Sequence, residues 1–173
     1  MGNGGGSIEL SIVPFGDVDR EVLDMLAERL SSLGFRVSIL DAAPIPKNAY
    51  NRERGQYESS HILELARRHP GDRVLGVVDV DLFSEPLNFV FGQAEIAGKA
   101  SVISLYRLKN DPSLYHGRAV KEAVHELGHT LGLRHCDDAL CVMHFSNSLA
   151  DTDVKGEKYC RKCRGKLKRN GIF

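Results

Sequence analysis

The chain has 173 residues, a length that suits one domain with a small appendage and can bury a sizeable core. Lys and Arg together number 23, as do Asp and Glu, so the formal net charge is zero and no overall field favours nucleic acid or an anionic membrane. No apolar run approaches the ~18 residues that a membrane span requires, and the composition is that of a globular protein.

The first seven residues are rich in glycine and lack the basic start and the apolar stretch of a signal peptide. We predict a flexible leader over 1–7, an N-terminal α/β part over 8–135 and a C-terminal part over 136–173. The missing secretion signal favours a cytosolic location, where cysteines serve more readily as metal ligands than as disulfides.

Hydrophobic periodicity predicts alternating strands and helices before the C-terminal part. The predicted strands cover 8–15, 35–40, 74–80 and 100–108, with a short one within 50–57, and helices begin near residues 17–19 and 59–60. The order strand, helix, strand favours a right-handed crossover and a parallel pair.

Two features of the strand region bear on function. Segment 88–96 contains Gly92 and is predicted to be an edge strand, whose unpaired backbone groups could hold an extended peptide. Asp79 and Asp81 end the predicted strand 74–80. We interpret them as polar residues at a strand terminus rather than as a catalytic carboxylate pair.

The most informative stretch is a His-Glu-x-x-His sequence in a helix predicted over 118–131. His125 and His129 are four residues apart, so their imidazoles share one helix face and can supply half of a tetrahedral zinc site. Glu126 can reach the open coordination position as a general base. A bare His-Glu-x-x-His also occurs by chance on solvated helix faces, so the interpretation needs further ligands.

His135 supplies the third candidate ligand. A continued helix would carry His135 away from the other two histidines, but Gly132 can end the helix in a left-handed turn that reverses the chain. Three imidazoles with one open position are typical of a catalytic zinc rather than a structural one.

A second cluster consists of four cysteines in the patterns Cys136-x4-Cys141 and Cys160-x-x-Cys163. Two short cysteine pairs predict a closed, structural zinc site, which would make two zinc ions per chain. Two disulfides or four buried thiols are the alternatives, and the spacing and the expected compartment favour zinc. Met143 follows Cys141 and could form a soft apolar floor beneath the three histidines, although alone it would indicate ordinary core packing.

Basic residues surround the second cysteine pair and would offset the charge of about −2 on a four-thiolate zinc. They are Lys155, Lys158, Arg161, Lys162, Arg164, Lys166, Lys168 and Arg169. The same basic residues also allow an alternative interpretation, in which the C-terminal part is a zinc-stabilised module that binds RNA. Few aromatic residues interleave it and the rest of the chain is not basic, so nucleic acid is the less favoured partner.

With its three histidines, Gly132, the four cysteines and Met143, the sequence resembles the archaemetzincins, a family within the metzincin clan of zinc peptidases. The resemblance extends from about residue 8 and is most specific after residue 124. It implies an α/β fold with a twisted mixed sheet, one antiparallel edge strand, an active-site helix and a small zinc-stabilised C-terminal subdomain. It also implies a peptidase-like zinc site and an intracellular location.

We therefore expect a monomeric zinc metallopeptidase, not membrane-bound, that hydrolyses peptides with a zinc-activated water and Glu126 as general base. Arg107 or Tyr115 could stabilise the tetrahedral oxyanion. The motifs leave open whether the enzyme is an endopeptidase or an aminopeptidase. The alternative from another class is the zinc-stabilised binding module with little or no peptidase activity.

Overall fold

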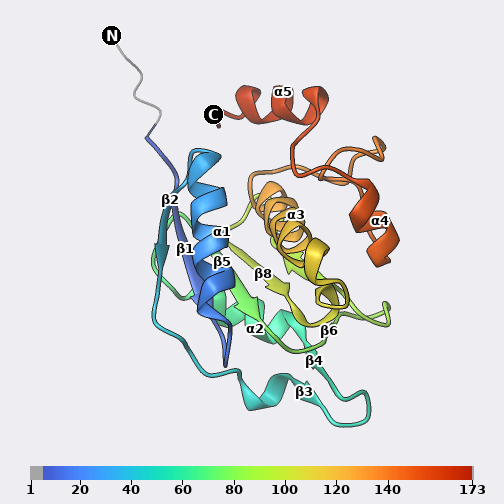
Figure 1. The fold of residues 1–173 in the computed structure, drawn as a ribbon. Helices are drawn as coiled ribbons and strands as arrows, with labels where there is room; N and C mark the ends of the chain where they lie inside the picture. The colour runs from blue at the N-terminus through green and yellow to red at the C-terminus, as the bar shows by residue number, and fades with distance from the viewer. Residues whose placement is uncertain (1–5, 173) are drawn as a thin grey trace.

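The computed structural model describes residues 6–172 (Figure 1). Most of the predicted leader therefore lies outside the described residues. Ser7, the last residue of that predicted leader, donates a hydrogen bond from its hydroxyl to the Gly34 carbonyl at 2.8 Å. None of the helices within 6–172 has the length and apolar character needed to cross a lipid bilayer.

A five-stranded sheet forms the centre of the fold. In spatial order its strands are β2 (Arg36–Ile39), β1 (Glu9–Pro14), β5 (Arg73–Val78), β8 (Ala100–Ser104) and β7 (Gly92–Ala94). The first four strands are parallel, and β7 is antiparallel to β8 at one edge. The expected mixed sheet with one antiparallel edge strand is thus confirmed.

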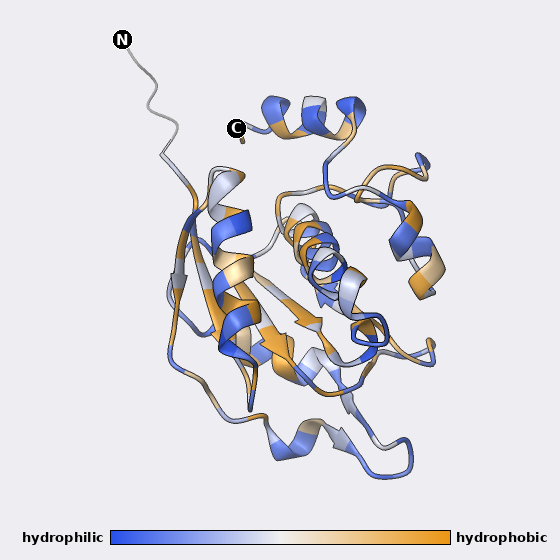
Figure 2. Ribbon diagram, in the orientation of Figure 1, coloured by the Kyte–Doolittle hydropathy of each residue, from blue (hydrophilic) through white to orange (hydrophobic). Residues whose placement is uncertain are grey.

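Helices cover both faces of this sheet. Helices α1 (Arg20–Ser32) and α3 (Pro112–Thr130) lie on one face, and α2 (Ser59–Arg67) lies on the other (Figure 1). Because side chains alternate along a strand, Ile12 of β1 packs with α1 and α3 whereas Val13 packs with α2. Figure 2 shows the result as apolar strands between helices with hydrophilic outer faces.

A smaller sheet of three short strands lies beside the main one. The remaining elements are η1 (Lys47–Ala49), β3 (Tyr50–Asn51), β4 (Gln56–Glu58), β6 (Leu82–Phe83), η2 (Tyr106–Leu108), α4 (Leu149–Val154) and α5 (Arg161–Arg169). Strand β4 pairs antiparallel with β3 and parallel with β6. The short strand expected within 50–57 is in fact a hairpin of two.

Three predicted boundaries were wrong. Helix α3 begins at Pro112 rather than near residue 118, because the Asp111 side chain accepts a hydrogen bond from the Ser113 amide at 2.9 Å and proline suits the first helical turn. The strand predicted over 100–108 ends at Ser104 and continues into η2. The edge strand expected over 88–96 is confined to β7.

The C-terminal part packs onto the α1 and α3 side of the sheet. Met143 and Leu167 are buried in the same apolar cluster as Leu127 of α3. The packing therefore runs without a break from the central sheet into the segment after residue 135.

Candidate metal centres and the cavity between them and the edge strand

Helix α3 places His125 and His129 one turn apart in the protein interior. Both rings are nearly buried, and their Nε2 atoms lie 3.2 Å apart. Nδ1 of His125 donates to the Val142 carbonyl at 2.7 Å, and Nδ1 of His129 donates to the Leu133 carbonyl at 2.8 Å. Because a carbonyl can only accept, Nδ1 carries the proton in each ring and the Nε2 lone pair is free for a metal.

The chain reverses at Gly132, whose φ is +96°. The Gly132 amide donates to the His129 carbonyl at 3.0 Å and the Leu133 amide to the Gly128 carbonyl at 2.9 Å, the two bonds of a Schellman cap. The reversal brings the His135 ring centroid to 4.9 Å from that of His129 and 5.4 Å from that of His125.

These three imidazoles fit a zinc ion. One nitrogen from each lies within 4.8 Å of those of the other two. Zn–N bonds in a tetrahedral site place two nitrogens about 3.3 Å apart, close to the separation between His125 and His129. Burial lowers the pKa of all three histidines, that of His125 well below its usual value, which keeps the rings neutral as a metal ligand requires.

The side chain of Glu126 extends from α3 toward the edge strand β7. A Cβ atom on Gly92 of β7 would lie 2.8 Å from Glu126 Cγ, so the glycine leaves the space that this side chain occupies. Burial raises the pKa of the Glu126 carboxyl well above its usual range, and the charge of Glu122 raises it further. A bound cation in the cavity would oppose both effects.

Sequence reasoning missed a buried ion pair beneath the histidines. Nζ of Lys155, whose side chain is fully buried, lies 3.7 Å from Glu122 Oε1 and 3.5 Å from Nδ1 of His125. Lys155 also donates to the His144 carbonyl at 3.3 Å. The Thr152 hydroxyl donates to Glu122 at 3.1 Å. A lysine in a basic run gives no sign in the sequence that it turns inward.

Met143 lies under the helix that carries two of the histidines. It is fully buried, and its Sδ lies against Gly128 of α3. The Met143 carbonyl accepts a hydrogen bond from the Cys136 amide at 3.0 Å, which ties this residue to the second cluster.

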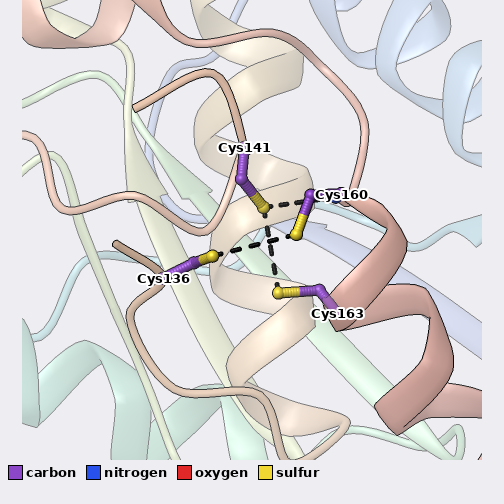
Figure 3. A group of neighbouring side chains, drawn as sticks. All are labelled: Cys136, Cys141, Cys160 and Cys163. Atoms are coloured by element: carbon purple, nitrogen blue, oxygen red, sulfur yellow. Dashed lines mark hydrogen bonds between the residues drawn. The ribbon is translucent and has the colours of Figure 1, made fainter. Parts of the chain in front are cut away.

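The four cysteine thiols point toward one another (Figure 3). Cys136 and Cys160 have their sulfurs 3.8 Å apart, as do Cys141 and Cys163, and all four sulfurs lie within 4.8 Å of one another. Tetrahedral zinc with four thiolates requires sulfurs about 3.8 Å apart, whereas a disulfide requires about 2.05 Å. The arrangement fits zinc. Although burial opposes it, hydrogen bonds from the Cys163 amide and the neighbouring thiols lower the pKa of Cys160 to about 7.

A cavity of about 620 Å³ opens between α3 and the edge of the sheet. The three histidines, Glu126 and Glu122 line one side, and residues 84–94, apart from Pro86, line the other. Arg107 and Tyr115 do not line it, so the expectation that either stabilises an oxyanion was wrong. Arg107 instead pairs with Asp81 at 2.7 Å, and Asp79 pairs with Lys109, as suits polar residues at a strand end.

Comparison with known proteins agrees with this geometry. An archaemetzincin of Methanocaldococcus jannaschii is 43% identical over 96% of both chains. The crystal structure of an archaemetzincin from Methanopyrus kandleri superposes with a TM-score of 0.87 and 40% identity, over 98% of this chain and 97% of that one. A zinc-dependent peptidase from Methanocorpusculum labreanum gives a TM-score of 0.81 and 29% identity over 91% and 99%.

The fold and the site together are those of a zinc metallopeptidase, a hydrolase. The model of one such family, Peptidase family M54, matches residues 10–169, and the chain belongs to that family.

Proposed function

We propose that this protein cleaves peptide bonds with His125, His129 and His135 as ligands of a catalytic zinc and Glu126 as general base. One observation carries the proposal: three neutral imidazoles converge beside a buried carboxyl on the wall of a cavity that borders an edge strand. This combination supplies a metal, a base and a place for an extended substrate.

Bound zinc supplies an activated water, with a pKa lowered toward about 7, and polarisation of the scissile carbonyl. Glu126 accepts the proton of the attacking water and passes it to the departing amine. Burial raises the pKa of this carboxyl above that of an exposed one, which makes its deprotonated form the stronger base. Gly132 and Met143 act as supports, the first by turning His135 inward and the second by packing under α3.

The substrate would bind along β7. The Phe91 carbonyl and the Glu95 amide are hydrogen-bonded to β8. By the alternation of an antiparallel ladder, the backbone groups of Gly92 and Ala94 face the open side. Three half-exposed apolar side chains, Leu87, Ile96 and Phe145, also line the cavity. We infer peptides with apolar side chains near the scissile bond.

We further propose that Cys136, Cys141, Cys160 and Cys163 hold a second, structural zinc, and that residues 136–173 form a subdomain organised by it. Four thiolates close the coordination shell and leave no position for a substrate. The reduced state that these ligands need suits the cytosol, and we expect a monomer.

Cleavage of a peptide library tests the general-base role. Glu126→Gln preserves the size of the side chain and should retain zinc while losing about 10²- to 10⁴-fold in kcat. Glu64→Gln, at an exposed glutamate of α2, is the matched control. Mass spectrometry of the products separates endopeptidase from aminopeptidase cleavage. Equal cleavage by Glu126→Gln and wild type would contradict the mechanism, and salt-sensitive RNA binding without any cleavage would favour the binding-module alternative.

A further inference from the structure

The wall of the cavity opposite the histidines is built from a segment without regular structure. Residues 84–91 connect β6 to β7, and every one of them except Pro86 lines the cavity. Few backbone hydrogen bonds hold the segment. The Leu87 amide donates to the Ser84 carbonyl at 2.9 Å within it, the Val90 amide donates to the Leu82 carbonyl at 3.0 Å, and the Phe91 carbonyl accepts from the Ser104 amide at 2.8 Å. Its shape must therefore depend on side-chain contacts from outside.

Arg54, between β3 and β4, supplies most of those contacts. Its Nη2 donates to the carbonyls of both Leu87 and Asn88 at 3.1 Å, and its guanidinium lies 4.1 Å from the centroid of the Phe83 ring. Nη1 lies 3.6 Å from a carboxylate oxygen of Glu85. One side chain thus contacts the start and the middle of the segment.

A second layer of polar residues supports Arg54. Gln56 accepts from Arg54 Nε at 3.0 Å and donates to the Asn88 carbonyl at 2.9 Å and to Asp81 at 2.9 Å. Asp81 in turn binds Arg107 through two bonds, and the Arg107 guanidinium lies 4.0 Å from the centroid of the Phe89 ring. The network therefore holds the segment at Asn88 and Phe89 as well.

We propose that Arg54 is a positioning residue for substrate binding, which holds the 84–91 wall against the cavity from behind. The proposal rests on the proposed peptidase function. Arg54, Gln56, Asp81 and Arg107 all lie outside the cavity lining, so they act through the wall and not on the reacting atoms. The hairpin of β3 and β4 in the small sheet therefore places Arg54 and Gln56 against the outer side of the wall.

Loss of the Arg54 donors should weaken binding of substrate and transition state alike. The wall contacts the peptide but not the water or the scissile carbonyl, so its misplacement raises KM and leaves kcat nearly unchanged. Arg54→Met keeps an apolar stem over Phe83 and removes the bonds to the Leu87 and Asn88 carbonyls. We expect KM to rise about tenfold and kcat to stay within about twofold.

The experiment compares three variants on a cleaved fluorogenic peptide, with zinc content measured for each. Arg52→Met is the matched control, because Arg52 lies in the same hairpin, is exposed, and has no side-chain partner among the residues that the structure describes. Arg54→Lys should have a KM between those of Arg54→Met and the wild type. An ammonium group can donate to a carbonyl but lacks the planar guanidinium fork that reaches two carbonyls at once. A KM for Arg54→Met equal to that of Arg52→Met, or a loss confined to kcat, would overturn the proposal.

Hydrogen exchange keeps the test independent of peptidase activity. Arg54→Met should speed exchange of the amides in 84–91 and leave those in 125–135 unchanged, whereas Arg52→Met should change neither. If the wild-type protein cleaved no peptide, the proposed peptidase function would be wrong, but the exchange measurement would still test the role of Arg54. Unchanged exchange of the 84–91 amides in Arg54→Met would overturn that role.

Discussion

Gly128 of α3 leaves the space that Met143 fills. A Cβ atom on Gly128 would lie closer to Met143 Sδ than two non-bonded atoms can approach, and 3.0 Å from Tyr159 Cε1. The glycine is therefore retained in the middle of a helix, where alanine would be intrinsically favoured, because the C-terminal part packs against it at van der Waals distance.

Gly128→Ala should consequently destabilise the protein although alanine is the better helix former. We expect a loss of about 1–3 kcal/mol from overpacking, measured by urea denaturation. Gly117→Ala in the same helix is the control: its Cβ would meet only Glu157 Oε1 at 3.7 Å, and it should stabilise by about 0.5–1 kcal/mol. Equal effects of the two substitutions would contradict the packing argument.

The buried pair of Lys155 and Glu122 predicts a non-additive effect. Lys155→Met leaves the Glu122 carboxylate buried without its cation and should cost about 3–5 kcal/mol in the free energy of unfolding. The double variant Lys155→Met/Glu122→Gln removes both charges and should recover most of that loss. A double-mutant cycle by thermal or urea unfolding measures the coupling, and simple additivity would argue against the pair.

Removal of one thiol should affect both metal centres. Cys163→Ser should reduce the zinc content from about two per chain to about one. It should also weaken zinc binding at the histidines by about 10- to 100-fold, because Val142, next to Cys141, carries the carbonyl that orients His125. Chelator competition measures both, and Arg161→Ser on the same helix is the control. Unchanged affinity at the histidines would show that the two centres are independent.

The pH dependence of zinc binding follows from the histidine pKa values. Burial holds the pKa of all three below the ordinary value of 6.5, so each ring is more often neutral at pH 6.5 than a free imidazole and fewer protons need be displaced by zinc. Zinc affinity at this site should change little from about pH 7.5 to 6.5 and should fall only as the pH drops through the lowered values. Competition with a chelator of known affinity at each pH provides the measurement. A steep loss already near pH 6.5 would contradict it.

Much of this site could be predicted because its signals are local. The interval from His125 to His135 spans one helix and one turn, and glycine is the residue that a Schellman cap requires. The start of α3 differs from the prediction because Ser113, His116 and Gly117 interrupt the apolar periodicity of its first turns, so that Asp111 and Pro112 are the signals of the helix start.

The contacts that join distant segments were out of reach of sequence reasoning. Arg54 meets the Leu87 carbonyl, and Lys155 meets Glu122, only after the sheet and helices have assembled. A charged side chain in a hairpin or a basic run has no pattern that distinguishes a buried partner from solvent. The same holds for Gly92, whose importance comes from its contact with Glu126 across two elements.

His135 and Cys136 are neighbours in the chain, yet each belongs to a different cluster. One peptide bond therefore joins the two clusters, and a displacement of either cluster would be transmitted directly to the other.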